Sequence, residues 1–202
     1  MRRIIINEHI SLDGVIQAPG GPDEDTTDGF KLGGWSANYG DDISGKTIID
    51  AIQEDYDLLL GRVTYDIWEP YWPFQTGPIA DKFNGIKKYV ATRTLKESSW
   101  EGTVLLNGDT IEQVKELRAS DGIDLHMWGS ADFIQSLFQH GLIDQMNLWI
   151  YPVVLGKGKK LFAAGTLPGG FKLIKHAMAS TGLIFASYEA NGEVQVGRIG
   201  EE

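Results

Sequence analysis

The chain has 202 residues, of which 42% are hydrophobic and 23% are charged, a composition typical of a globular protein with one sizeable core. Its net charge is −10, from 28 acidic and 18 basic residues, so it lacks the basic surplus that a nucleic-acid-binding surface needs, although a local basic pocket could still hold a small anion. No cysteine occurs, which excludes disulfides, thiolate metal sites and cysteine nucleophiles.

The N-terminal segment, MRRIIINEHISLDG, has two arginines but only three consecutive isoleucines before polar residues begin. It is too short for a secretory signal, and no stretch approaches 18 apolar residues, so we expect a cytoplasmic protein that does not enter a membrane. The β-branched residues at its start predict a first strand over 2–12.

Short apolar runs then alternate with stretches of helical period. The further strand candidates are 55–61, 87–93, 103–107, 124–129 and 145–156. Apolar spacing predicts helices over 44–55, 109–120 and 130–141, with Asp109 and Ser130 as the N-caps of the last two and Gly141 as a stop. Residues 170–192 predict two strands joined at Thr181-Gly182, an antiparallel hairpin.

This order of elements predicts a single α/β domain over 1–202, with a mostly parallel sheet and antiparallel edge strands. One connection, residues 13–42, is too long to be a simple link and is rich in glycine and proline. Two interpretations fit it equally: a mobile, flap-like loop over a ligand site, or a solvated insertion.

Ligands of parallel α/β sheets bind beyond the carboxyl ends of the strands. The predicted strands end at SLDG, GRVTY, TRT and GSADF, so each exit offers the glycine, hydroxyl or arginine groups that hold phosphate. In GRVTY, Gly61 allows close approach, Thr64 could cap the following helix, and Arg62 could grip an anion. The alternative is an ordinary helix start with a solvated arginine.

The other two exits extend this pattern. Gly129 and Ser130 precede a predicted helix whose N-terminal amides and dipole would favour a pyrophosphate, or they form only a tight turn. Thr92 and Arg93 place a second arginine at a strand end. Two arginines at two exits suit a ribose 2′-phosphate, so the pattern favours NADP over NAD, unless these are unrelated surface arginines.

The remaining candidates are weaker. The four histidines are widely scattered and show no metal-ligand spacing. Lys157 and Lys159 could contact an anionic substrate or could belong to a solvated turn. The loop aromatics Trp35, Trp68, Trp72 and Phe74 could stack on a planar heterocycle or simply cover the core.

The succession SLDG, LLLGRVTY, KYVATRTL and WGSADFIQSLFQHGLIDQMNLWIYPVVLGKGKKLF resembles the dihydrofolate reductase-like superfamily. It is most similar to the reductase domain at the C-terminus of the bifunctional riboflavin biosynthesis deaminase–reductase, over nearly the whole chain. The resemblance implies a three-layer α/β/α fold and an NADPH-dependent reductase acting on a ribosylated pyrimidine or a similar polar heterocycle.

The resemblance also implies roles for individual residues. Gly61, Arg62, Thr64, Thr92 and Arg93 would hold the 2′-phosphoribose, Gly129 and Ser130 would take the pyrophosphate, and Leu12, Asp13 and Gly14 would cover the nicotinamide. Asp13 could orient the nicotinamide amide or a substrate hydroxyl. From the residues themselves rather than from the resemblance, Trp35, Lys157 and Lys159 are the candidate substrate contacts. Dihydrofolate reductases carry an acid on the helix before the Gly-Arg strand, and Asp41 and Asp42 are the nearest candidates here.

Two other functions stay open. The same fold could serve as a nucleotide-binding module without turnover, or as a freestanding reductase of folates or other heterocycles. A homodimer is also expected, by resemblance and because the apolar run NLWIYPVVL would otherwise risk an exposed edge strand. The alternative is that this run lies inside the sheet of one chain.

Overall fold

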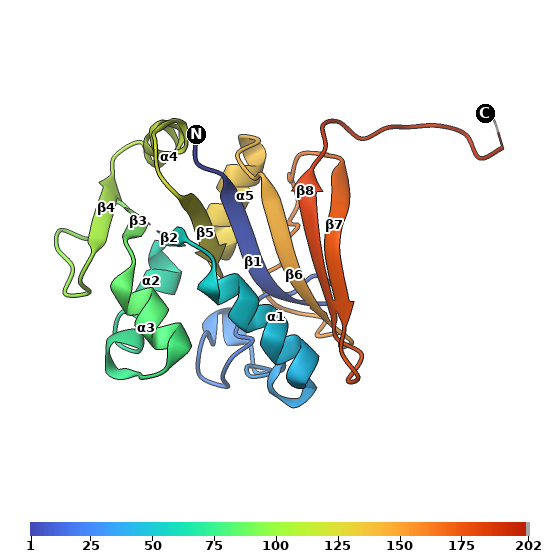
Figure 1. The fold of residues 1–202 in the computed structure, drawn as a ribbon, viewed down its shortest axis with the longest axis horizontal. Coiled ribbons are helices and arrows are strands. Elements are labelled where there is room, and N and C mark those ends of the chain that lie inside the picture. Colours follow the sequence, from blue (N-terminus) through green and yellow to red (C-terminus); the bar gives the residue numbers. More distant parts are fainter. Residues whose placement is uncertain (201–202) are drawn as a thin grey trace.

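One mixed sheet forms the centre of the protein in a computed structural model that describes residues 1–200 (Figure 1). The strand order is β4-β3-β2-β5-β1-β6-β8-β7. The strands are β1 (Ile4–Ser11), β2 (Tyr56–Gly61), β3 (Lys88–Thr92), β4 (Thr103–Asn107), β5 (Asp124–Trp128), β6 (Gln145–Tyr151), β7 (Phe171–Met178) and β8 (Ile184–Ala190).

The pairing confirms a mostly parallel sheet with a C-terminal hairpin. All pairs among the six strands β1, β2, β3, β4, β5 and β6 are parallel. β8 runs antiparallel to β6, and β7 runs antiparallel to β8. β1 lies between β5 and β6, two strands that come more than 110 residues later in the chain. The carboxyl ends of β1, β2, β3 and β5 therefore meet at one edge of the sheet.

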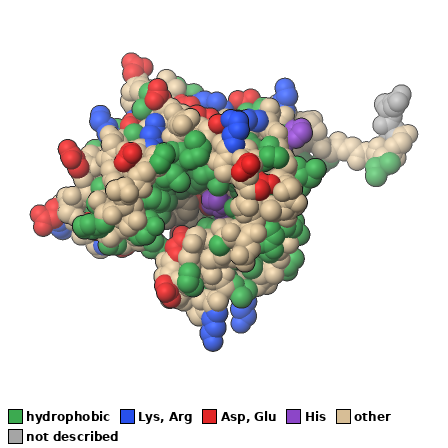
Figure 2. Space-filling view, turned by 60° about the horizontal axis from the view of Figure 1, so that its bottom comes forward, with side chains coloured by type: hydrophobic (Ala, Val, Ile, Leu, Met, Phe, Trp, Pro, Cys, Tyr) green, Lys and Arg blue, Asp and Glu red, His purple; other side chains and the backbone are tan. Residues whose placement is uncertain are grey.

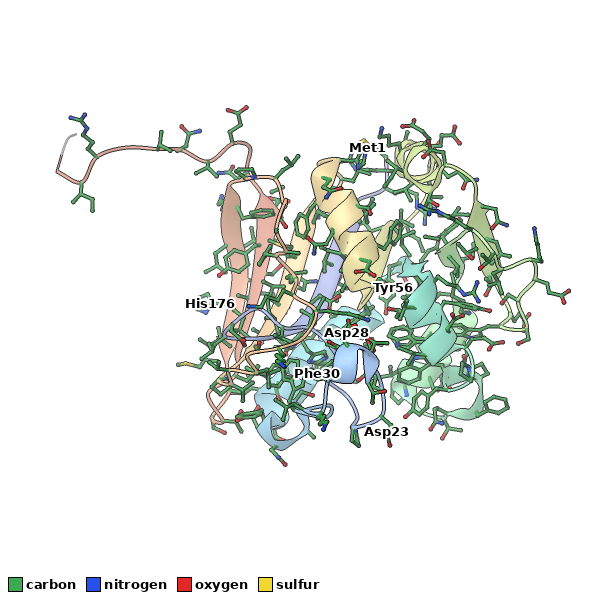
Figure 3. The ribbon with its side chains drawn as sticks, turned by 180° about the vertical axis from the view of Figure 1, so that it is seen from behind. Met1, Asp23, Asp28, Phe30, Tyr56 and His176 are labelled. Atoms are coloured by element: carbon green, nitrogen blue, oxygen red, sulfur yellow. The ribbon has the colours of Figure 1, made fainter. Side chains whose placement is uncertain are left out.

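Helices cover both faces of the sheet. The α-helices are α1 (Asp42–Gln53), α2 (Arg62–Trp68), α3 (Pro78–Gly85), α4 (Thr110–Ala119) and α5 (Ala131–Gln139). α1 and α3 lie in front of the sheet in Figure 1, and α5 lies in front of it in the reverse view of Figure 3. The three-layer α/β/α architecture is thus confirmed.

Alternation along β1 assigns its side chains to the two faces. Ile4, Ile6 and Ile10 pack with Ile134 and Leu137 of α5 in one core cluster. Glu8 has the same parity as these isoleucines and therefore points to the α5 face. His9, one residue later, points to the opposite face, where it stacks at 5.5 Å on Trp149 of a second cluster.

Local chemistry explains where the elements differ from the sequence predictions. α1 begins two residues earlier than expected because Asp41 and Ser44 form a reciprocal capping box. β6 ends at Tyr151 because Pro152 has no N–H to continue the ladder. The sequence predicts no range for α2 or α3, each about two turns long; of the two, only α2 is anticipated, as the helix after Thr64.

The strand expected at an exposed edge lies inside the sheet. β6, which contains most of NLWIYPVVL, pairs with β1 on one side and β8 on the other. The premise that this run forms an exposed edge was therefore wrong. The edge strands are β4 and β7, and β7 carries exposed Leu173, Ile174 and Met178. Self-association stays a prediction. Light scattering that gives a monomer mass at micromolar concentration would reject it.

Two further features concern residues 1–200. None of their helices is long and apolar enough to cross a membrane. No three of their histidine, aspartate and glutamate side chains gather in a way that could hold a metal ion.

Candidate active site

A cleft of about 1010 Å³ opens at the carboxyl ends of β1, β2, β3 and β5. Figure 2 shows it as a central hollow with apolar side chains on one side and a histidine at its floor. His9 is the histidine among the lining residues. Eight candidate cofactor- or substrate-binding residues line this cleft: Gly61, Arg62, Thr64, Thr92, Arg93, Gly129, Ser130 and Lys159. The loop aromatics Trp68 and Trp72 and the N-cap residue Asp109 line it as well.

Arg62 is held in place by its neighbours at the strand exits. Its Nε donates to Asp66 Oδ1 at 2.6 Å, and its Nη1 donates to the hydroxyls of Thr94 at 2.9 Å and Thr92 at 3.3 Å. Within residues 1–200, Nη2 makes no hydrogen bond. The guanidinium is therefore fixed in the cleft, and its Nη2 can still donate hydrogen bonds to an anion. The exposed Arg93 lines the same cleft.

The turn after β5 forms a second candidate anion-binding site. Gly129 and Ser130 have φ of +63° and +71°, so both adopt the left-handed conformation just before α5. A Cβ at Gly129 would lie 3.0 Å from Thr64 Oγ1, which means that only glycine leaves this space open. The amides of the turn and the N-terminus of α5 together suit a phosphate group.

The structure corrects two details of the capping predictions. Ser130 occupies the N-cap position of α5, but its side chain makes no capping bond and instead accepts from the Gly61 amide at 2.9 Å. Thr64 does not cap the next helix, because α2 already begins at Arg62 with Gly61 as its N-cap. Asp109 does cap α4, accepting from the Glu112 amide.

The Gly61–Ser130 contact gives a first testable prediction. A Cβ at Gly61 would lie 3.1 Å from the Cβ atoms of Ser130 and Phe133, so Gly61→Ala should push α5 away from β2. We expect about 1–3 kcal/mol lower unfolding free energy, measured by urea denaturation, and weaker NADPH binding.

Gly45→Ala is the matched control for Gly61→Ala. It adds the same methyl group on exposed α1, where nothing lies within 4 Å of the new Cβ, and should stabilise the protein by about 0.5–1 kcal/mol. Unchanged stability and binding in Gly61→Ala would show that the contact tolerates a side chain.

Residues 13–42 supply one wall of the cleft, through Ile16 to Gly20, Glu24, Asp25 and Ser36. The Gln17 side chain ties this segment together by donating to the carbonyls of Asp25 and Thr27 and accepting from the Lys159 amide. Figure 3 shows the segment below α5, with Asp23 at its outer edge. Its position over the cleft agrees with the flap-like interpretation, and its mobility stays a prediction.

Glu8 is a buried carboxyl in the cleft that the sequence analysis did not single out. It is 3% exposed, and its Oε1 has no hydrogen-bond partner within residues 1–200. Burial raises its pKa well above the usual value, against the lowering effect of a hydrogen bond from the Gly129 amide. Glu8 is therefore protonated at pH values where an exposed glutamate is charged.

The raised pKa of Glu8 predicts a pH-dependent effect of Glu8→Gln. Folded Glu8 keeps its proton above pH 4.5 while the unfolded chain loses it, so the contribution of Glu8 to stability falls as pH rises. The variant should melt at a similar temperature near pH 4.5 and several degrees above wild type at pH 8, at about 2–4 °C per kcal/mol. A melting difference that is constant with pH would contradict this.

His9 and Tyr151 form a pair beside the apolar part of the cleft. His9 Nδ1 lies 2.7 Å from Tyr151 Oη. Burial lowers the pKa of His9 to about 4 and raises the pKa of Tyr151 to about 12, so both are neutral at pH 7. Within residues 1–200, Nε2 of His9 makes no hydrogen bond and is free for a ligand.

Six candidate site residues do not line the cleft, and neither do Asp41 and Phe74, which were also singled out from the sequence. Leu12 is 63% exposed, Asp42 is exposed on the first turn of α1, and Lys157 is exposed in its turn. Trp35 donates from Nε1 to the Gln17 carbonyl and packs against Tyr151. Gly14 forms the turn after β1 with φ +86°. The geometry thus does not support Asp42 as a catalytic acid or Trp35 and Lys157 as substrate contacts.

Asp13, the sixth, is a structural brace. Its carboxylate accepts from the amides of Leu155 at 3.0 Å and Gly156 at 2.8 Å, and from Ser11 Oγ at 2.7 Å. The hydrogen bond from Leu155, followed by that from Ser11, lowers its pKa to about 2. Asp13 therefore ties the end of β1 to the segment after β6 and does not face the cleft.

The comparisons with known proteins agree with this geometry. The family model described as the RibD C-terminal domain matches residues 2–185. The chain is 30% identical to the protein YyaP of Bacillus subtilis (strain 168) over 196 residues, which cover 95% of this chain and 96% of YyaP.

Solved structures share the fold at lower identity. A protein from Shewanella sp. PV-4, named for riboflavin biosynthesis, matches with a TM-score of 0.70 and 20% identity, over 94% of this chain and 99% of its own. A pyrimidine reductase-like protein from Corynebacterium diphtheriae matches at 0.60 and 13%, over 95% and 93%. Dihydrofolate reductase from Enterococcus faecalis, solved with NADP(H), matches at 0.57 and 13%, over 94% and 96%.

Proposed function

Because the chain belongs to the RibD C-terminal domain family, a family of reductases, we propose that it uses NADPH to reduce a heterocyclic substrate. The observation that carries this proposal is the position of Arg62. Its guanidinium is fixed by Asp66, Thr92 and Thr94 in the same cleft as the Gly129–Ser130 turn. One site thus offers a fixed cation for a 2′-phosphate and backbone amides for a pyrophosphate.

The residues present fit NADPH. Arg62, Arg93 and Thr94 would hold the 2′-phosphate, and Gly129 and Ser130 would hold the pyrophosphate at the start of α5. When bound, NADPH supplies a hydride, and reduction of a C=N or C=O bond also takes up one proton. Burial raises the pKa of Glu8, which reduces the negative charge that this carboxyl places beside the Gly129 turn.

The chain itself must position the substrate and handle the proton. His9 is the candidate for both tasks, because its free Nε2 can hydrogen-bond a substrate while Tyr151 exchanges a proton with Nδ1. Residues 16–20 of the cleft wall and the aromatic side chains on its other side would keep bulk water away from the reacting atoms.

Binding of NADPH and NADH, followed by quenching of tryptophan fluorescence, tests the proposal. Trp68, Trp72 and Trp128 line the cleft, so a bound dinucleotide should change their emission. Clear preference for NADPH is the expected result. Binding of neither dinucleotide would overturn the proposal.

The rival function is a nucleotide-binding module without turnover. One observation favours it: both carboxylates singled out as catalytic, Asp13 and Asp42, lie outside the cleft. Steady oxidation of NADPH in the presence of a pyrimidine, pterin or flavin would exclude this rival, whereas binding without oxidation across such a panel would support it.

A further inference from the structure

A row of aromatic side chains lines one part of the cleft. Trp68 stacks on Phe83 at 4.7 Å, Trp72 meets the edge of Phe83 at 5.0 Å, and Phe83 lies 6.3 Å from Trp128. His9 extends the row, 6.4 Å from Trp128. All five rings border the cleft, but Phe83 and Trp128 are buried, so the partly exposed Trp68, Trp72 and His9 are the rings open to a ligand.

Three isoleucines complete this space, which we call the aromatic chamber: His9, Ile48, Ile52, Trp68, Trp72, Ile79, Phe83 and Trp128. Ile48 and Ile52 come from α1 and Ile79 from α3, two helices that pack together. The chamber therefore lies on the α1/α3 face of the sheet.

No lysine or arginine among the described residues belongs to this chamber. The cationic side chains that line the cleft are Arg62, Arg93 and Lys159. Arg62 and Arg93 follow β2 and β3 and are the residues proposed above to bind the 2′-phosphate of NADPH. The Lys159 ammonium is bound to Asp25 at 2.7 Å, so it is already neutralised. His9 adds no charge at pH 7, since burial holds its pKa at about 4.

Two polar groups of the wall lack partners. The indole N–H groups of Trp72 and Trp128 are buried and make no hydrogen bond within residues 1–200. Buried donors of this kind are normally paired, so the wall beside the cleft holds unmet hydrogen-bonding capacity. Flat heterocycles with ring carbonyls and ring nitrogens can stack on tryptophan.

We propose that the substrate is a flat, conjugated heterocycle without a phosphate group, bound in the aromatic chamber. A substrate phosphate there would lose its hydration without meeting a cation, and that cost is large. The inference rests on the proposed function only in treating the occupant as a substrate. It narrows the ribosylated pyrimidine or similar polar heterocycle that the family resemblance implies to a heterocycle without a phosphate.

Riboflavin and riboflavin 5′-phosphate are suitable probes, because they share one flat ring and differ only by the phosphate. Stacking on tryptophan quenches flavin fluorescence, so binding is measured directly, without turnover and both with and without NADP⁺. We expect riboflavin to bind at least about tenfold more tightly than its phosphate. Equal binding, tighter binding of the phosphate, or no quenching by either would overturn the proposal.

A cation placed in the chamber should reverse the preference. Ile79→Arg adds a guanidinium among the aromatic rings and should favour riboflavin 5′-phosphate. Ile43→Arg, at a position of α1 that is 45% exposed and outside the cleft, is the control and should leave the preference unchanged. An unchanged preference in a folded Ile79→Arg would place the flavin elsewhere and overturn the proposal.

The two proposals fail in different ways. If riboflavin binds the chamber and NADPH does not bind, the reductase proposal fails and the chamber remains a heterocycle site. If NADPH binds and only the phosphorylated flavin is held, the reductase proposal survives and the substrate class is wrong.

Discussion

Arg62→Ala is expected to weaken NADPH binding by about 10- to 100-fold and NADH binding by no more than about twofold. The reason is that NADPH alone carries a 2′-phosphate, and a hydrogen bond to a charged group contributes about 1.5–3 kcal/mol. The fold should survive, because the Arg62 side chain is one-third exposed and makes only side-chain hydrogen bonds at the rim of the cleft. Titrations of the two dinucleotides against tryptophan fluorescence give both constants.

Two variants make the Arg62 experiment interpretable. Arg62→Lys keeps the charge but loses the planar fork that reaches Thr94 and Asp66 together, so NADPH affinity should fall between wild type and Arg62→Ala. Lys157→Ala removes an exposed cation outside the cleft and should change neither affinity. Equal losses of NADPH and NADH in Arg62→Ala would mean that this residue does not contact the 2′-phosphate.

His9→Gln should lower kcat by about 100-fold or more with little change in NADPH affinity. A positioned acid–base group contributes about 10²- to 10⁴-fold to catalysis, and glutamine can hydrogen-bond but cannot exchange a proton. Turnover is measured as NADPH oxidation with whichever heterocycle the panel identifies. His140→Gln, at an exposed position at the end of α5, is the control and should retain wild-type kcat.

A second measurement on His9→Gln needs no substrate. Because the pKa of His9 is about 4 when folded and 6.5 when unfolded, the unfolded chain binds more protons between these values. Wild-type stability should therefore fall as pH drops from 6.5 to 4, and His9→Gln should lose part of this fall. If kcat and the pH dependence of stability both match wild type, His9 is neither buried as described nor catalytic.

The parts of the site that the sequence predicted are those built from consecutive residues. Gly61-Arg62 and Gly129-Ser130 each combine the end of a strand with the start of a helix, so a short stretch contains both the position and the chemistry. Parallel pairing then brings the strand ends together without further information. The local caps were less predictable, because the Ser130 hydroxyl is used by Gly61, which lies 69 residues away.

The aromatic chamber could not be predicted in this way. Phe83 belongs to α3, a helix of eight residues, and Trp128 ends a strand that also contains Asp124 and His126, so neither local stretch indicates that the two rings share a face. They meet only because α3 packs on the face of the sheet to which Trp128 points. Glu8 and His9 could have been singled out as the two ionisable residues of a buried first strand that begins with three isoleucines.

For Asp13, the sequence suggested a functional role that the structure does not support. A carboxylate directly after the first strand has the position expected of a catalytic group, yet the amides of Leu155 and Gly156 occupy it. Those amides lie 142 and 143 residues further along the chain, so no local pattern indicates that Asp13 is already engaged.

The central position of β1 has a consequence for synthesis on the ribosome. β1 pairs only with β5 and β6, and β5 begins at Asp124, so the first strand to be translated has no partner until more than half of the chain has been made. During that time the nascent chain carries an apolar strand with both edges open, a state prone to aggregation. The position of β1 between β5 and β6 places Glu8 and His9 in the cleft. The same position means that the nascent chain cannot complete its sheet until β5 and β6 have been synthesised.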